Sequence, residues 1–306
     1  MNKCSIIYNP ISTGFNIKVL EGVTTVFERN GFNIKLIKSR HPNHIQSIIP
    51  YENDNTDLII TLGGDGTYGE AIQGFNECEQ KALYSHVAVG TSNDVAKNFN
   101  LSTNPILTAS SILTGKEKDI DIINVNNTCF GYVSCFGALT DIPCKTKLSL
   151  KKRFGKNAYL ISAIPDIFKL IKNKIPSYNI TYNKNDELIR SNCLMGFVSN
   201  SKGFSNVNIY PNADISDGLF EVMIIKNVNN KFIFNVLKDY LLNKIDLNKY
   251  NDFIDVFKTK SIDICFNGTS PKRVDNDGDI ANIDLTNNGS LSYRADKKIK
   301  MLLPKL

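Results

Sequence analysis

The sequence predicts a two-domain protein in which an open parallel α/β sheet is followed by a mainly antiparallel β-sandwich. Two observations predict this fold. In the first 120 residues, short apolar runs alternate with helical segments, as in a parallel sheet with helices on both faces. After about residue 120, short strands separated by turn residues follow one another with few helices, as in an antiparallel sheet or sandwich. We expect a first domain over 1–122, a second over 123–294, and a return of 295–306 to the first.

The first domain is expected to hold four strands, each followed by a turn and a helix. The strands are the runs KCSIIY at 3–8, FNIKLIK at 32–38, LIITL at 58–62 and HVAVG at 86–90. Runs rich in Ile and Leu and bounded by glycine are typical of buried strands in parallel sheets. The helices are expected over 16–29, near 43–50, over 68–75 and from Ser92 onward.

The second domain is expected to be built from short strands. The apolar runs that predict them are DIDIINVNNTCFGYVSCF, YNITYN, CLMGFVSN, LFEVMIIK, SIDICF and LSYRA. Two helical segments, near 157–173 and 230–243, interrupt this series. The change from alternating helices and strands to strands alone is what places the domain boundary near residue 122.

Three turns of the first domain are expected to share one edge of its sheet. NPISTG (9–14), GGDGT (63–67) and GTSND (90–94) each follow a predicted strand, and ligands bind outside the carboxyl ends of such strands. Glycines can bring main-chain N–H groups around one anion, and the start of the next helix adds partial positive charge. The motif GGDGT therefore predicts a phosphate site. A tight strand-to-helix turn without a ligand is the alternative.

Composition excludes several classes of protein. Hydrophobic residues are 42% and charged residues 22% of the 306 residues, values typical of a soluble globular chain. The net charge of +6 favours anionic partners, but no dense basic stripe with aromatics predicts nucleic-acid binding. Seven scattered cysteines without a CxxC pair, and only three histidines, favour reduced thiols over disulfides or a zinc site. Without a signal peptide or membrane span, we expect a cytoplasmic protein.

The glycine turn lacks the GxxxxGK[ST] pattern of a P-loop and the GxGxxG pattern of a dinucleotide-binding turn. Four motifs in order instead resemble the diacylglycerol kinase catalytic-domain family, and in particular its small bacterial lipid kinases: GGDGT with Glu70, GTSNDVAK at 90–97, DGLFEV at 217–222 and DGD at 277–279. GGDGT alone is also found in NAD kinases and, loosely, in phosphofructokinases. The resemblance covers nearly the whole chain and implies a first domain similar to those kinases, with ATP in a cleft between the two domains.

The resemblance also implies the residues that contact ATP. They lie in the three turns, with one candidate near the end of the second strand: Asn9, Pro10, Ser12, Thr13, Gly14, Ser39, Gly63, Gly64, Asp65, Gly66, Thr67, Glu70, Thr91 and Asn93. Compared with the family, NPISTG has one more residue before its glycine, and Lys97 stands where arginine is common.

Magnesium is implied at two places. Asp65 and Asp94 stand where the family has acids connected to Mg²⁺, which prefers carboxylate and phosphate oxygens. The carboxylate of Asp217, with main-chain oxygens of Asp214 and Leu219, stands where the family binds a structural Mg²⁺. A plain β-turn at 217–218 is the alternative.

Asp279 is the expected catalytic base, assisted by Asp65, which would help to place the metal. The family normally has a glutamate at the position of Asp279, proposed to take the proton from the acceptor hydroxyl. An aspartate keeps the carboxylate but is one methylene shorter, and a base must reach its proton. A rigid site would lose about 10²-fold in rate from such a change.

A basic segment predicts contact with a membrane. KTKLSLKKRFGK, from Lys145 to Lys156, holds six lysines and arginines beside the predicted helix AYLISAIPDIF. Such a run is often only a solvated face, but on an enzyme with a lipid substrate it would bind an anionic bilayer reversibly. An exposed strand at a sheet edge would allow a homodimer.

The sequence thus favours an ATP-dependent, Mg²⁺-assisted kinase that phosphorylates a hydroxyl of a diacylglycerol-like lipid. Two alternatives stay open. One is a small-molecule kinase similar to NAD kinases, although a second glycine-and-threonine segment for its acceptor is not found. The other is a nucleotide- or lipid-binding module whose catalytic function has decayed at Asp279.

Overall fold

The computed structural model describes residues 2–155, 157–172, 175–204, 207–241, 246–285 and 289–305. Its N-terminal part is a parallel sheet with the strand order β2-β1-β3-β4. The strands are β1 (Lys3–Tyr8), β2 (Asn33–Lys38), β3 (Leu58–Gly63) and β4 (Leu83–Ala88). All four are where the sequence predicts them to within a few residues, and the open parallel sheet is confirmed.

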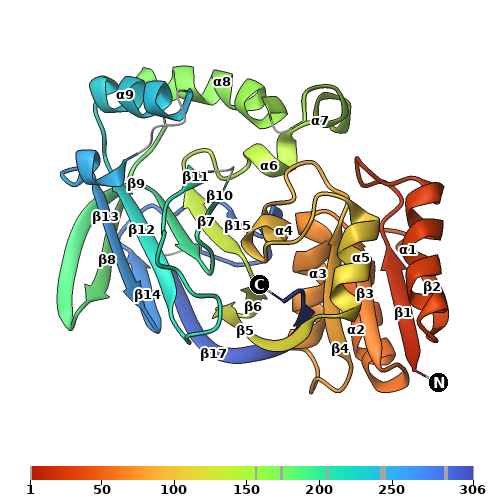
Figure 1. The fold of residues 1–306 in the computed structure, drawn as a ribbon. Helices are drawn as coiled ribbons and strands as arrows, with labels where there is room; N and C mark the ends of the chain where they lie inside the picture. Colours follow the sequence, from red (N-terminus) through yellow and green to blue (C-terminus); the bar gives the residue numbers. More distant parts are fainter. Residues whose placement is uncertain are drawn as a thin grey trace.

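Helices cover both faces of this sheet (Figure 1). They are α1 (Ile17–Arg29), α2 (His44–Asn55), α3 (Asp65–Asn76), α4 (Asp94–Asn98) and α5 (Pro105–Leu113). On one face, α1 and α5 bury Phe27 and Ile112 against Ile6 and Ile60. On the other face, α2 and α3 bury Ile49, Ile72 and their neighbours against Ile59. Helices on both faces explain why β3, between β1 and β4, is buried along its whole length.

The C-terminal part consists mostly of antiparallel strands, as predicted. The longer strands are β5 (Lys116–Val125), β7 (Val133–Gly137), β8 (Tyr178–Lys184), β9 (Glu187–Ser199), β12 (Phe220–Lys226), β13 (Ile254–Thr259), β14 (Ser261–Phe266) and β17 (Ser290–Leu303). The short ones are β6 (Thr128–Phe130), β10 (Gly203–Phe204), β11 (Val207–Asn208), β15 (Val274–Asn276) and β16 (Asp279–Ala281). Their inward side chains form a separate aromatic and aliphatic core that includes Phe136, Phe220 and Tyr293.

A row of helices lies along one end of the C-terminal part, at the top of Figure 1. These are α6 (Ile142–Lys145), α7 (Leu148–Phe154), α8 (Asn157–Ile171) and α9 (Asn230–Leu241), and a 3₁₀ turn, η1 (Leu247–Tyr250), follows. The two predicted helices over 157–173 and 230–243 correspond to α8 and α9, and residues 173, 242 and 243 lie outside the described residues. No helix in the described part of the chain is long and apolar enough to cross a bilayer.

The long final strand, β17, joins the two parts. It pairs antiparallel with β14 and β5, and near its end it pairs in parallel with β4 through Met301 and Tyr84. The chain thus comes back to the first sheet in its last residues, as Figure 1 shows for the blue strand that curves beneath both parts. Since β5 runs continuously through residue 122, the domain boundary there stays a prediction.

Candidate active site

A cavity of about 1160 Å³ opens between the carboxyl edge of the parallel sheet and the C-terminal strands. Most of the residues expected to bind ATP or to act in catalysis line it. They are Asn9, Pro10, Ser12, Thr13, Ser39, Gly64, Asp65, Gly66, Thr67, Glu70, Thr91, Asp94 and Asp279. Three more of the expected residues belong to the same turns but do not line the cavity: Gly14, Gly63 and Asn93. The expected structural Mg²⁺ ligands lie outside the cavity: Asp214, Asp217 and Leu219.

The GGDGT turn is shaped by its glycines. A Cβ on Gly90 would lie 2.5 Å from the Cα of Gly64, so the second and third turns can approach each other only without side chains at these positions. A Cβ on Gly63 would lie 2.2 Å from the side chain of Thr67. Helix α3 begins at Asp65, inside the motif, so the motif that lines the cavity includes a helix N-terminus, which favours an anion.

Hydrogen bonds hold the three turns together. The side-chain amide of Asn9 donates to Thr67 Oγ1 at 3.3 Å, and the hydroxyls of Thr13 and Thr91 lie 3.1 Å apart. Behind them, Gly14 N donates to the carbonyl of Val89 at 2.9 Å. In the third turn, Gly90 N donates to Asn93 Oδ1 at 2.7 Å. Gly14 and Asn93 thus shape the loops that present the lining residues.

Asp65 and Asp94 lie side by side in the cavity wall. Asp65 Oδ1 accepts from Val95 N at 3.1 Å, so its carboxylate caps the short helix α4. Burial raises the pKa of Asp65 to about 6, and the charge of Asp94 adds to this effect. Asp94 pairs with Lys97, whose Nζ lies 2.6 Å from Oδ1.

These two carboxylates fit a magnesium ion that also binds phosphates. A divalent cation would offset the repulsion from Asp94, which adds to the effect of burial on the pKa of Asp65, and both acids line the cavity beside the glycine turn. Protein acids alone do not make a site here, because no group of three or more Asp, Glu, His or Cys side chains in the described ranges could hold a metal ion. Phosphate oxygens would have to complete the coordination.

The carboxylate of Asp279 reaches the glycine turn from the opposite wall. Asp279 begins β16, and its Oδ2 lies 2.9 Å from where a Cβ on Gly66 would stand. The side chain lines the cavity. Desolvation by the surrounding protein raises the pKa of Asp279, and the positive charge of Lys151 on α7 acts against that rise. The structure therefore places two acids that are far apart in the sequence, Asp65 and Asp279, in the lining of one cavity.

Glu70 has a mainly structural set of contacts. Its Oε2 accepts from Ile45 N at 3.0 Å, at the start of α2. Burial raises the pKa of Glu70, and the negative charge of Asp279 adds to it. Glu70 thus fixes α2 against the site while one side of it faces the cavity.

Asp277 also lines the cavity. It lies inside the DGD motif, but the sequence analysis did not predict it to be a site residue. Its carboxylate accepts three main-chain hydrogen bonds, from Gly131 N at 2.9 Å, Tyr132 N at 3.0 Å and Val133 N at 2.9 Å. Burial raises its pKa to about 7 although these three amides favour the ionised form. Asp277 and Gly278 both have positive φ, 55° and 92°, which is the geometry of a two-residue turn between β15 and β16.

Another part of the cavity lining is apolar, and no pattern in the sequence indicated it. It comes from the segment before α6, from α6 to α8 and from β9: Leu139, Ile142, Leu148, Leu160, Ala163, Met195 and Phe197. Tyr159 of α8 also lines the cavity and hydrogen-bonds with Thr91 and Ser92 of the third turn. A polar lining rich in amides and acids thus shares one cavity with a lining suited to hydrocarbon.

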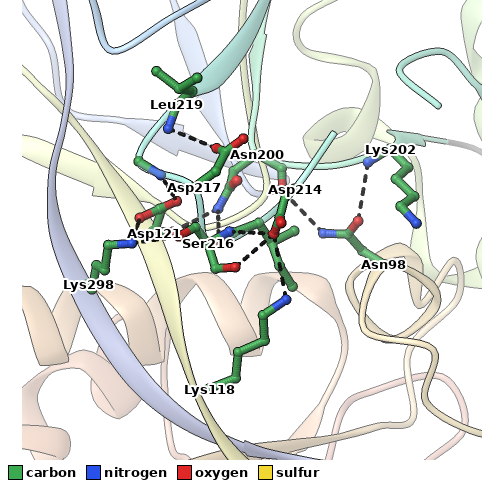
Figure 2. Close-up of polar contacts among 12 residues, drawn as sticks. Asn98, Lys118, Asp121, Asn200, Lys202, Asp214, Ser216, Asp217, Leu219 and Lys298 are labelled. Atoms are coloured by element: carbon green, nitrogen blue, oxygen red, sulfur yellow. Dashed lines mark hydrogen bonds and ion pairs between the residues drawn. The ribbon is translucent and has the colours of Figure 1, made fainter. Parts of the chain in front are cut away.

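Asp214, Asp217 and Leu219 belong to a separate polar cluster outside the cavity (Figure 2). Leu219 N donates to Asp217 Oδ1 at 3.0 Å, and the other oxygen of this carboxylate, Oδ2, lies 2.6 Å from Lys258 Nζ. Lys258 neutralises the only carboxylate that this set offers, and the other two donors are neutral main-chain oxygens, so the set does not fit a bound Mg²⁺. We derive no catalytic step from this cluster.

Comparisons with known proteins agree with the fold and the motifs. Residues 3–125 match the model of the diacylglycerol kinase catalytic domain. The chain is 27% identical over 238 residues to a diacylglycerol kinase of Bacillus subtilis, covering 75% of each chain, and 26% identical over 232 residues to one of Staphylococcus saprophyticus, covering 74% of each. A crystal structure of a diacylglycerol kinase from Bacillus anthracis has the same fold, with a TM-score of 0.73 at 16% identity, over 99% of this chain and 97% of the other.

Proposed function

Because this chain belongs to the diacylglycerol kinase catalytic domain family, we propose that it is an ATP-dependent lipid kinase that phosphorylates a hydroxyl of a diacylglycerol-like lipid. One observation carries the proposal beyond the family. The same cavity is lined by a glycine turn and two acids and by a set of apolar side chains, and Asp279, which also lines it, lies against Gly66 of the turn. A phosphate donor and a lipid acceptor would each find matching chemistry.

In this proposal the triphosphate lies against the first amides of α3, with Asn9, Thr13 and Thr91 around it. Bound Mg²⁺ would supply charge neutralisation on the phosphates, held from the protein side by Asp65 and Asp94. The hydroxyl oxygen of the lipid attacks the γ-phosphorus. A new O–P bond forms, the bond from the γ-phosphorus to the bridging oxygen breaks, and ADP leaves.

Asp279 accepts the hydroxyl proton in this step. Its carboxylate lies against Gly66, so the shorter side chain still stands beside the turn that would hold the phosphates. A raised pKa keeps it a better proton acceptor than an exposed aspartate, and the charge of Lys151 limits how far that pKa rises. Most of the catalysis would come from positioning and electrostatics, as is usual for phosphoryl transfer.

The test is a transfer assay with purified protein, Mg²⁺ and γ-labelled ATP. Diacylglycerol, phosphatidylglycerol, a sphingoid base and NAD are offered separately as acceptors. We expect label in one of the lipids and none in NAD. Label in NAD alone would favour the small-molecule kinase, and a folded protein that labels no acceptor would favour a binding module.

We further propose that α7 and α8 bring the cavity to an anionic membrane. Six of the exposed large apolar residues lie on these helices: Leu148, Phe154, Ile161, Ile164, Phe168 and Ile171. The last four are spaced along one face of α8, while Leu160 and Ala163 of the same helix line the cavity. Insertion of that outer face would place the apolar lining of the cavity next to the bilayer.

Exposed cations lie in the segment that leads into α8. Lys145, Lys147, Lys152 and Arg153 of the predicted basic segment are exposed, and Lys156 lies outside the described residues. Each cation near an anionic surface adds about 1 kcal/mol of binding free energy. Since the donor would be cellular ATP, the proposal places the protein in the cytoplasm with transient membrane contact.

Vesicle sedimentation tests the membrane surface. The double variant Ile164→Ser, Phe168→Ser is expected to bind phosphatidylglycerol vesicles more weakly than the unmodified protein. Leu188→Ser removes a leucine of β9 that is at least as exposed as either residue, and it is the control, for which we expect no change. Equal binding of both variants would exclude α8 as the contact.

A further inference from the structure

The segment 214–219, which we call the acid loop, lies between β17, β5 and the start of β12, outside the cavity (Figure 2). Two of its side chains are acids, Asp214 and Asp217, and a third acid, Asp121 of β5, lies against it and is almost fully buried. Three carboxylates this close to one another repel unless positive charge compensates them. The source of that charge is therefore a question about the fold itself.

Hydrogen bonds within the loop use one side of each carboxylate. Asp214 Oδ1 accepts from the Ser216 hydroxyl at 2.7 Å and from Ser216 N at 3.1 Å. Leu219 N donates to Asp217 Oδ1 at 3.0 Å, and Gly218 N donates to Asp121 Oδ2 at 2.7 Å. These contacts shape the turn but leave the negative charges in place.

Three lysines from three different strands supply the positive charge. Lys258 of β13 places its ammonium 2.6 Å from Asp217 Oδ2 and 3.5 Å from Glu221 Oε1. Lys298 of β17 lies 3.0 Å from Asp121 Oδ1 and donates to the carbonyl of Ser216 at 2.6 Å. The third, Lys118 of β5, is 3.6 Å from Asp214 Oδ1.

We propose that the chain's own lysines, with Lys258 foremost, neutralise the acid loop in place of a bound Mg²⁺, so that the loop folds without metal. The family resemblance implies a structural ion at Asp217. An ammonium at 2.6 Å from Asp217 Oδ2 occupies the side of the carboxylate that such an ion would need. One buried acceptor nearby, Asn200 Oδ1, has no hydrogen-bond partner among the described residues, but a single neutral oxygen is a weak ligand for Mg²⁺.

The loop matters because it connects the two parts of the molecule. Asn200 donates from its side chain to the carbonyl of Asp121 at 2.9 Å, and Asn98 of the N-terminal part donates to the carbonyl of Asn200 at 3.1 Å. Asn98 ends α4, the helix that Asp65 caps in the candidate active site. The lysines thus stabilise a junction behind the site, whatever reaction the protein catalyses.

Thermal unfolding of the full chain without nucleotide tests the proposal. The melting temperature is measured in EDTA and in millimolar MgCl₂, for the unmodified protein and for Asp217→Asn. For each protein we take the change in melting temperature between EDTA and MgCl₂. Ions bound near Asp65 and Asp94 change the melting temperature of both proteins, so only the difference between the two changes reports on Asp217. We expect this difference to be zero. A Mg²⁺-dependent rise that Asp217→Asn abolishes would overturn the proposal.

Lys258→Met provides the second comparison. It leaves Asp217 without its cation, and we expect the melting temperature in EDTA to fall by about 2–4 °C. Mg²⁺ should restore part of this loss by taking the position that the ammonium vacates. Lys260→Met, which changes an exposed lysine next to β13, is the matched control and is expected to change neither value. Equal effects of the two substitutions, or no recovery with Mg²⁺, would contradict the proposal.

Discussion

Asp279 is the residue on which the proposed chemistry depends most. Removing its negative charge with Asp279→Asn is expected to lower kcat by about 10²–10⁴-fold, because a positioned base contributes that much. ATP affinity should hardly change, since the turns that would bind the triphosphate are on the opposite wall. The measurement is a comparison of kcat with nucleotide binding for the two proteins.

Asp279→Glu separates an active site from a decayed one. If the aspartate already reaches the acceptor, the longer side chain is expected to keep kcat within about tenfold of the original. Activity that appears only in Asp279→Glu would show that the natural residue is too short and that the chain has lost its catalytic function.

Asp65 should make the free energy of unfolding depend on pH. Its pKa is about 6 in the folded protein, mainly because of burial, whereas an aspartate in an unfolded chain titrates near pH 4. Between these values the folded protein holds a proton that the unfolded chain has released, so stability falls as pH rises. The loss from this one group is at most about 3 kcal/mol, complete just above pH 6.

The isosteric change Asp65→Asn removes this titration while keeping an oxygen that can accept from Val95 N. Urea unfolding from pH 4.5 to 7.5, without Mg²⁺ or nucleotide, is the measurement. We expect the variant to gain stability relative to the original protein as pH rises. A difference between the two that is the same at every pH would show that Asp65 titrates normally.

At the scale of elements, the hairpin of β15 and β16 is the piece that carries Asp279 into place. Asp277 at its tip is held by three amides of residues 131–133, and its Cβ lies 2.8 Å from where a Cβ on Gly69 would be. We expect Asp277→Asn to lower the free energy of unfolding by about 2 kcal/mol or more, because its amide cannot accept all three bonds.

The same change should lower kcat by about 10²-fold by displacing Asp279. Asp263→Asn is the control: Asp263 forms an exposed ion pair with Arg294, and such pairs are worth less than about 1 kcal/mol. Urea unfolding and kcat are measured for both. If the two variants unfold at the same urea concentration, Asp277 does not hold the hairpin.

Elements were predictable where the pattern is local. The four strands of the first sheet follow from their apolar runs, and α8 and α9 from their spacing. Helix α5 was missed although Asn104 caps it through Ile106 N and Pro105 occupies its first position, which are readable signals. Helix α3 begins three residues before its predicted start. Gly66 and Gly69 have a poor helix propensity, but each packs closely against the distant β15–β16 hairpin, Gly66 against Asp279 and Gly69 against Asp277, and this packing compensates for it.

Contacts between distant segments could not be predicted from periodicity. The approach of Asp279 to Gly66 depends on the docking of one hairpin tip, and the lysines around Asp217 come from three separate strands. Only the family resemblance pointed to a common cleft; although its DGD motif includes Asp277, it assigned no role to this residue and did not indicate the apolar lining. The strand β2 lies at the edge of the sheet, so pairing of two copies there stays a prediction.

For the whole molecule, the shared final strand explains how one cavity can be built from two parts. Because β17 pairs with β4 of the first sheet and with β5 and β14 of the second part, the two walls of the cavity belong to one hydrogen-bonded framework. The three turns proposed to bind the triphosphate lie on one wall, and Asp279 and the apolar lining lie on the other. We infer that phosphoryl transfer takes place across this gap.

A crystal structure with a non-hydrolysable ATP analogue and Mg²⁺ tests that inference most directly. We predict that amides of residues 64–67 lie within about 3 Å of phosphate oxygens and that the carboxylate of Asp279 faces the γ-phosphate across the space left for a hydroxyl. A triphosphate bound elsewhere, or one that leaves Asp279 facing no part of it, would contradict the account.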